Sequence, residues 1–211
     1  MWAFILAGEI PIQIGNLQNL DYLALHSNNL TGSIPPKIFN ISTITRITLA
    51  DNHFSGHLPS TIGHSLPNME WLIFPKNKLS GTIPNSITEA SKISVLDLSY
   101  NSFSGLIPNT LGNLRLLNML NLAYNCLTTE SSANGMLAFL GLGSNPLRGI
   151  LPQLIGNFSE SLRKFFAHDC KLKGSIPQEI GNLRGLILLS LFNNDLDGTI
   201  PTSVRTLKTL Q

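Results

Sequence analysis

The sequence contains little charge. Only 12% of its 211 residues are charged and the formal net charge is +2, whereas a typical soluble domain has about 25% charged residues. Fourteen Lys and Arg against twelve Asp and Glu cannot form the extended basic surface that nucleic-acid binding requires. A hydrophobic content of 43% with so low a net charge also excludes a disordered chain. We therefore expect a folded protein that binds no nucleic acid.

Cysteine and long apolar stretches are also scarce. Two Cys residues exclude a disulfide-dense scaffold and a zinc site made of cysteine alone. No stretch reaches the ~18 consecutive apolar residues of a membrane-spanning helix. The apolar run from Trp2 to Ala7 is shorter than the hydrophobic region of a signal peptide and has no basic residue before it. The sequence thus predicts neither a transmembrane segment nor a signal peptide in this chain.

Two motifs recur along the chain with one period. The tetrad Gly-x-(Ile/Leu)-Pro occurs eight times, with its prolines 24, 24, 25, 24, 44, 25 and 24 residues apart. Each tetrad after the first is preceded by L-x-L-x-x-N-x-L. Its Asn position, which we call the ladder position, is filled by Asn28, Asn52, Asn77, Asn101, Asn125, Asn145, Cys170 and Asn194. Two features that share a period indicate a protein of about eight structural repeats.

Each position of the repeat has a physical role. Leucines that alternate with other residues, as in Leu23-Ala24-Leu25, predict a short strand with one buried face. Strands stacked in register form a parallel sheet along a solenoid, in which each unit buries its leucines against its neighbours. The Asn amide after the strand can satisfy backbone groups that the bend exposes, and Cys170 is a poorer substitute. The Gly and Pro that follow predict a turn and then a helical or 3₁₀ segment.

The full pattern L-x-x-L-x-L-x-x-N-x-L-x-G-x-I-P-x-x-I-G-N-L resembles the plant-type leucine-rich repeat. Segments such as Leu79-Ser80-Gly81-Thr82-Ile83-Pro84 and Ile180-Gly181-Asn182-Leu183 are similar to those in the ectodomains of plant leucine-rich-repeat receptor-like Ser/Thr kinases. Within these it is most similar to the subfamily that contains immune receptors for bacterial flagellin and elongation-factor peptides. The resemblance implies an α/β repeat solenoid, a right-handed superhelix with a concave parallel β-sheet and short 3₁₀ or helical turns on its convex side.

One repeat and both ends depart from this pattern. The repeat at residues 126–144 is shortened, because Asn125 and Asn145 are 20 residues apart. Leu137, Leu140 and Leu142 keep the strand register, so the shortening must fall in the convex loop. A tolerated loop variation and a locally disrupted coil both remain open. The chain begins and ends inside a repeat and has neither of the family's paired-cysteine caps, so we expect an uncapped section of a longer solenoid in residues 1–211.

The concave face is the expected binding surface, because the strand residues between the buried leucines point outward there. Exposed aromatic residues and arginine are enriched at binding hot spots. The alternative is that some of these side chains only cover neighbouring leucines. The candidate ligand-binding residues are Tyr22, His26, Arg46, Trp71, Asp97, Tyr100, Phe139, Lys164, Phe166, His168 and Phe192.

The sequence predicts no catalytic residue, metal site or cofactor. His53 and His57 flank a turn and not a helix face, so their spacing does not indicate a metal site, and the signature motifs of a kinase are absent. Three Asn-x-Ser/Thr sequons, at Asn29, Asn40 and Asn157, are candidate glycosylation sites, although an Asn-rich chain forms some by chance. All three lie outside the predicted strands.

We interpret the chain as a non-catalytic recognition module. The resemblance implies the extracellular ligand-binding part of a plant receptor-like kinase or receptor-like protein in defence or developmental signalling. The implied partners are an extracellular peptide or protein and possibly a co-receptor leucine-rich-repeat kinase. The implied location is the outer side of the plasma membrane, as part of a parent receptor, or the secreted fraction. Two alternatives remain open: a secreted leucine-rich-repeat inhibitor of microbial cell-wall hydrolases, and a nonfunctional or decoy truncation.

Overall fold

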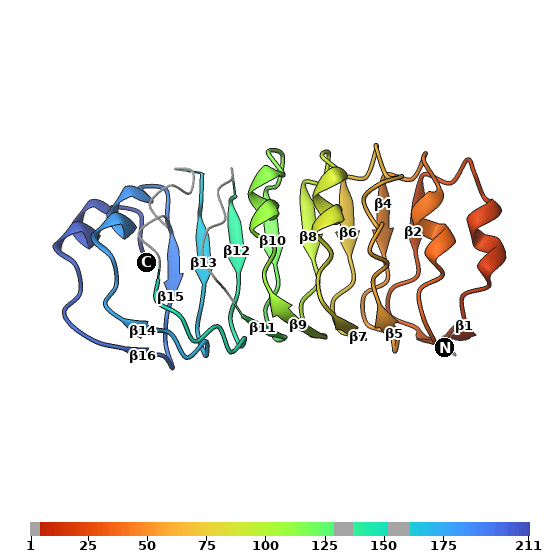
Figure 1. Cartoon of the computed structure of the whole chain (residues 1–211). Helices are drawn as coiled ribbons and strands as arrows, with labels where there is room; N and C mark the ends of the chain where they lie inside the picture. Colours follow the sequence, from red (N-terminus) through yellow and green to blue (C-terminus); the bar gives the residue numbers. More distant parts are fainter. Residues whose placement is uncertain (1–4, 129–136, 152–160) are drawn as a thin grey trace, which may run out of the picture.

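A computed structural model describes residues 5–128, 137–151 and 161–211. One short strand from each repeat joins a parallel eight-stranded sheet, and the strands lie side by side along the molecule (Figure 1). The fold class predicted from the repeat is confirmed. The strands of this concave sheet are β2 (Tyr22–Ala24), β4 (Arg46–Thr48), β6 (Trp71–Ile73), β8 (Val95–Asp97), β10 (Met119–Asn121), β12 (Phe139–Gly141), β13 (Lys164–Phe166) and β15 (Leu188–Ser190).

The register of the sheet keeps equivalent positions in rows. Leu72 in β6 pairs with Ile47 in β4 and Leu96 in β8, and all three side chains are buried. Burying an aliphatic side chain stabilises a fold by about 1.5–3 kcal/mol, so each coil holds its neighbours mainly through this row. The residues before and after the buried one point outward from the same strand, and they form the concave surface.

The ladder asparagines close each bend after the strand. The Asn101 side-chain amide donates to the carbonyls of Phe74, Leu98 and Ser99, and its oxygen accepts from the Leu79 N–H at 3.0 Å. One side chain therefore satisfies backbone groups on its own coil and on the coil before it, as the donor and acceptor capacity of an amide allows. The same set of hydrogen bonds recurs at Asn52, Asn77, Asn125 and Asn145.

Cys170 fills one ladder position without an amide. Its thiol lies 3.4 Å from the Leu142 carbonyl and 3.1 Å from the His168 carbonyl. A thiol is a weak acceptor, and the Leu147 N–H, which an amide oxygen would have bound, donates to the Asn145 carbonyl at 2.8 Å instead. Arg148, the next residue, has a positive φ of 57°. The coil before Cys170 thus turns differently from the regular coils.

On the convex side the prolines of the tetrads start 3₁₀ helices. Each proline stands at the residue before the helix with a φ between −58° and −70°, which is the value its ring imposes. Among the described helices, consecutive ones pack against each other in three pairs. They are η1 (Ile12–Asn16), η2 (Pro36–Asn40), η3 (Asn85–Glu89), η4 (Asn109–Asn113), η6 (Gln178–Asn182) and η7 (Thr202–Thr206).

A second set of parallel strands, which the sequence did not predict, runs along one side of the solenoid (the lower edge in Figure 1). It forms where the chain passes from the ladder position to the tetrad, and Gly56 or Gly81 in it has a φ near +80° (81° and 79°). The pairs are β1 with β3, then β5, β7, β9 and β11 in one sheet, and β14 with β16. Their bounds are β1 (Ala7–Glu9), β3 (Asn29–Thr31), β5 (Ser55–His57), β7 (Lys78–Gly81), β9 (Ser102–Leu106), β11 (Cys126–Thr128), β14 (Lys173–Gly174) and β16 (Asp195–Leu196).

The shortened repeat keeps its concave half in place. Strand β12 pairs in register with β10 and β13, and Asn145 is fully buried with its ladder hydrogen bonds intact. The convex part of this repeat, residues 129–136, lies outside the described residues. The structure therefore places the strand of the short repeat in the sheet and leaves the position of the shortening as an expectation.

Candidate functional site

The concave surface is built by the outward-facing residues of the eight strands and of the turn after each strand. Its outer residues form rows across the sheet because the strands are in register: Tyr22 lies beside Arg46, and Arg46 beside Trp71. The residue just before the ladder position has a left-handed backbone in every described coil (Tyr100 has φ 52°, Tyr124 has φ 57°). This turn directs an additional side chain of each coil to the edge of the concave surface.

At the N-terminal end of this surface lies a shallow hollow of ≈ 250 Å³, the N-terminal hollow. Short side chains, Thr48 and Ala50, line it between Tyr22 on one side and Trp71 on the other. Tyr22 and Trp71 are 47% and 37% exposed, so both present rings to solvent. The remaining lining residues are His26, Ser27, Arg46, Ile47 and Ile73.

Arg46 lies at the edge of the N-terminal hollow in a defined position. Its guanidinium carbon is 4.4 Å from the centre of the Trp71 ring, a cation–π contact. One of its terminal nitrogens is 3.5 Å from the Glu70 carboxylate, and both side chains are about half-exposed (43% and 44%). Such an exposed ion pair contributes little free energy, so the tryptophan ring is the main support of the guanidinium.

At the centre of the concave surface, polar side chains form hydrogen bonds with one another. The Ser99 hydroxyl donates to the Asp97 carboxylate at 2.7 Å, and the Ser99 N–H donates to the same oxygen at 3.0 Å. The Asn121 amide donates to the other Asp97 oxygen at 3.3 Å. Asp97, a candidate from the sequence, is thus held in place by neighbours on its own and the next coil.

Toward the C-terminal end the surface carries a series of touching rings, which we call the aromatic strip: Tyr100, Tyr124, Phe139, Phe166, His168 and Phe192. The Tyr100 and Tyr124 rings stack with centroids 4.0 Å apart, and the His168 and Phe192 rings stack at 4.6 Å. Edge contacts at 6.3–6.4 Å join His168 to Tyr124 and to Phe166. Phe166 lies 5.5 Å from Phe139.

Two further observations concern contacts within the aromatic strip. Gly143 lies beneath His168, and a methyl group there would come within 2.6 Å of the imidazole ring, so the glycine lets His168 reach across to Tyr124. Interaction with the Tyr124 hydroxyl, with a small contribution from burial, raises the pKa of Tyr100 above its ordinary value of 10.0.

The structure assembles most of the predicted residues into these two regions. Tyr22, His26, Arg46 and Trp71 line the N-terminal hollow. Tyr100, Phe139, Phe166, His168 and Phe192 belong to the aromatic strip. Lys164 is exposed at the start of β13, beside Phe139 of the aromatic strip in the register of the sheet. The roles of all of them stay predictions. Tyr124 is not among the residues predicted from the sequence, although it stands at the same repeat position as Tyr100.

The chemistry available on this surface is that of binding. Within the described ranges, no three His, Cys, Asp or Glu side chains gather closely enough to hold a metal ion. No helix among the described residues is long and apolar enough to cross a membrane. Side chains on the concave surface offer rings, hydroxyl groups, amides and one supported guanidinium, which suits an extended partner laid across the strands.

Two of the three sequons can be placed. Asn29 is exposed in β3, a strand of the second sheet that the sequence did not predict. Asn40 is exposed at the end of η2 on the convex side. Asn157 lies outside the described residues. Asn29 and Asn40 both lie in elements outside the concave sheet and are candidate glycan acceptors.

The repeat, its solenoid and its ladder define a leucine-rich-repeat domain, and comparison with known proteins agrees. The sequence model of the family named for the leucine-rich-repeat domain of the EGF-like domain-containing protein ComC matches residues 2–97. The sequence model of the Leucine Rich Repeat family matches residues 92–114. Phytosulfokine receptor 1 of Arabidopsis thaliana is 38% identical over 78 residues, which cover 37% of this chain and 8% of the receptor. Receptor kinase-like protein Xa21 of Oryza sativa subsp. japonica is 52% identical over 58 residues, 27% of this chain and 6% of that protein.

Solved structures extend the similarity to nearly the whole chain. The plant peptide hormone receptor RGFR1, solved in complex with RGF2, matches 98% of this chain at 33% identity with a TM-score of 0.90, and the match covers 33% of the receptor chain. The TDR receptor matches 98% at 32% identity with a TM-score of 0.87, covering 36% of that chain. The chain is therefore a leucine-rich-repeat domain homologous to plant receptor kinases and receptor-like proteins, and it spans less than a tenth of the curated relatives and about a third of these ectodomains.

Proposed function

We propose that this chain is the ligand-recognition part of a plant receptor kinase or receptor-like protein and binds an extracellular peptide on its concave surface. The observation that carries the proposal is the similarity of almost the whole chain to the ectodomain of a receptor solved with a peptide hormone. The exposed rings of Tyr22, Trp71 and Phe192 (47%, 37% and 58%) support it, because a concave face rich in exposed aromatic residues is typical of a binding surface.

The proposal includes the surroundings of the module. The domain itself is non-catalytic and works outside the cell, and any kinase activity belongs to a parent protein. A receptor kinase in the same structural class was solved with a peptide hormone and the co-receptor SERK1, which supports a co-receptor kinase as a second partner of this chain. Defence or developmental signalling is the process in which such a receptor acts.

Selection from a random peptide library tests the proposal. The 1–211 chain, secreted from plant cells and immobilised, is exposed to linear peptides of about twelve residues, long enough to span the concave sheet at roughly 3.3 Å per residue. We expect enriched peptides whose affinity falls about tenfold or more in the double variant Trp71→Ala with Phe166→Ala, because truncating hot-spot rings costs about 2 kcal/mol or more.

A matched control uses apolar residues on the other faces. Ile12 and Leu116 are 51% and 60% exposed, in η1 and in the turn after η4, and the double variant Ile12→Ala with Leu116→Ala should bind the same peptides as tightly as the wild type. Circular dichroism checks that both double variants are folded. Equal binding by the concave-face variant, or the absence of any enriched peptide, contradicts the proposed function.

A further inference from the structure

The N-terminal hollow has a shape suited to a single side chain or chain end of a ligand. Its two ring walls come from β2 and β6, which lie two strand steps apart with β4 between them. Two steps at about 4.8 Å separate the walls by roughly 10 Å. The strand between them carries Arg46 in the same row as the two rings. It also contributes the short Thr48 and, just beyond its end, Ala50 to the floor, so the slot is bounded by Tyr22, the Arg46 guanidinium and Trp71.

Hydrogen-bond donors without partners among the described residues line this slot. No hydrogen bond from the side chains of Tyr22, Ser27 or Thr48 is found among the described residues. This differs from the centre of the concave surface, where Asp97, Ser99 and Asn121 bond to one another. Unpaired donors facing solvent are available to an acceptor on a ligand.

Arg46 adds a positive charge that a ligand can recruit. The Trp71 ring holds the guanidinium from one side at 4.4 Å. Its carboxylate partner Glu70 is at 3.5 Å and half-exposed, a weak pairing that a better-placed acid can replace. Arginine presents its donors in a planar fork that matches a carboxylate.

The distance to the aromatic strip sets the length of a ligand that reaches both regions. From β4, which carries Arg46, to β12, which carries Phe139 near the middle of the strip, the sheet order gives four steps. Four steps at about 4.8 Å amount to roughly 19 Å, which an extended chain covers with about six residues at 3.3 Å each.

We propose that the ligand, in the peptide-binding role given above on which this inference rests, is an acidic extended peptide that is anchored at two points. One carboxylate enters the N-terminal hollow and pairs with Arg46, accepting hydrogen bonds from the hydroxyl groups of Tyr22 and Thr48. An aromatic or large apolar residue about six residues away lies on the aromatic strip. The hollow thus selects for charge, and the strip selects for apolar area.

Charge substitutions with opposite expected effects test this inference. Peptides enriched on the wild-type chain should contain Asp or Glu about six residues from an aromatic or large aliphatic residue. Arg46→Gln should weaken the binding of a synthetic enriched peptide about tenfold, as loss of a charge-assisted hydrogen bond does. Glu70→Gln should tighten it about twofold to threefold, because it removes the competing carboxylate and leaves Arg46 in place.

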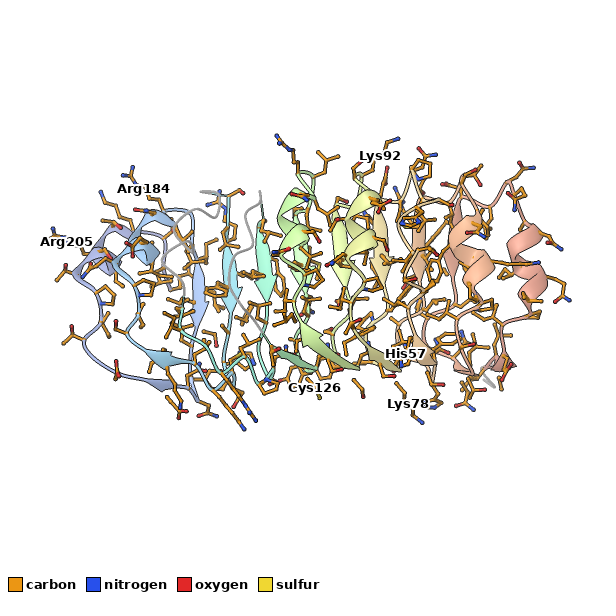
Figure 2. The ribbon with its side chains drawn as sticks, viewed as in Figure 1. His57, Lys78, Lys92, Cys126, Arg184 and Arg205 are labelled. Atoms are coloured by element: carbon orange, nitrogen blue, oxygen red, sulfur yellow. The ribbon has the colours of Figure 1, made fainter. Side chains whose placement is uncertain are left out.

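The control changes net charge away from the concave surface. Arg205 is exposed in η7 at the C-terminal end of the molecule (Figure 2), and Arg205→Gln should leave the affinity unchanged. Replacing the acidic residue of the peptide with Gln should abolish the difference between Arg46→Gln and the wild type. A further test is Ala50→Leu, which fills the hollow without changing the charge. This variant should weaken binding of the acidic peptide about as much as Arg46→Gln does.

The outcomes separate this inference from the proposed function. If enriched peptides lose affinity in the Trp71→Ala, Phe166→Ala variant but contain no recurring acid, or if Glu70→Gln weakens them, the proposed function stands and the carboxylate site is wrong. If the peptides bind independently of both regions, or none is enriched, both proposals are wrong. Recurring acidic residues together with opposite effects of Arg46→Gln and Glu70→Gln support the site.

Discussion

The two cysteines illustrate how the place of a residue in the repeat decides its chemistry. Cys126 lies exposed in β11, which pairs with β9 in the second sheet, and the strands that carry Lys78 and His57 follow beyond β9 along the same edge (Figure 2). Cys170 is fully buried at a ladder position, and desolvation raises the pKa of its thiol from 9.0 to about 11. A thiol reacts as the thiolate, so burial and the raised pKa both disfavour reaction at Cys170.

We therefore predict that only one thiol of the native chain reacts quickly with an aromatic disulfide reagent at pH 8. Cys126→Ser should remove this fast reaction, and Cys170 should react only after unfolding. Two fast thiols in the wild type would contradict the buried position of Cys170.

The raised pKa of Cys170 also predicts a pH dependence of stability. Ionisation of this thiol has no effect on the free energy of unfolding below about pH 9. As the pH rises from there toward 11, the thiol ionises first in the unfolded chain, so the free energy of unfolding falls.

At the scale of the elements, glycine serves two different purposes in one repeat. Gly56 lies in the second sheet with a φ of 81°, and a methyl group there would make only ordinary contact with Ser33. Gly63 lies in the convex turn with no unusual φ, but a methyl group there would overlap the carbonyl oxygen of Ser86 on the next coil. The first glycine is needed for its backbone conformation and the second for close packing between coils.

This difference predicts unequal effects of the same substitution. Gly63→Ala should lower the free energy of unfolding by about 2–3 kcal/mol, since the overlap involves backbone that must shift. Gly56→Ala should lower it by about 1 kcal/mol, the cost of a left-handed φ for a residue with a Cβ atom. Urea unfolding of both variants, followed by circular dichroism, measures the two values. An equal or reversed order would show that the coils can separate at the convex side without cost.

At the scale of the whole molecule, the coils are joined by the concave sheet throughout and by the second sheet only in part. The second sheet is continuous from β5 to β11, and among the described residues single bridges join Ser33 to Ser55 in β5 and Ile150 to Lys173 in β14. The second of these joints coincides with Cys170, which has no amide oxygen to accept the Leu147 N–H. In a solenoid the coupling between adjacent coils sets how cooperatively the molecule unfolds.

We predict that Cys170→Asn raises the free energy of unfolding by about 1 kcal/mol, the net value of a typical added hydrogen bond, and makes the unfolding transition steeper. Asn101→Cys, a matched control in a regular coil, should lower the free energy by about 1–3 kcal/mol because it leaves backbone groups without partners. Thermal and urea unfolding of both variants provide the test. A lower midpoint for Cys170→Asn would indicate that the coil before it is packed around the smaller thiol.

Most of the fold follows from the sequence because the repeat imposes it locally. The strand around Leu72, the ladder bonds of Asn101 and the 3₁₀ turn after Pro84 each depend on residues within one repeat and its neighbour. The second sheet was not predictable in this way. Its strands, such as Ser55–His57, lack hydrophobic alternation, and they form because stacking the coils brings their backbone groups into line.

The candidate site was also predictable from the sequence only in part. The sequence alone determined which positions face outward and that several of them are aromatic, because strand periodicity assigns every second residue to one side. Only the tertiary structure decided that Tyr124 stacks on Tyr100, that Gly143 admits His168, and that short residues between Tyr22 and Trp71 leave a hollow. Those outcomes depend on the shapes of side chains in neighbouring coils. These side chains are separated by at least one full repeat in the sequence and come into contact only when the coils stack.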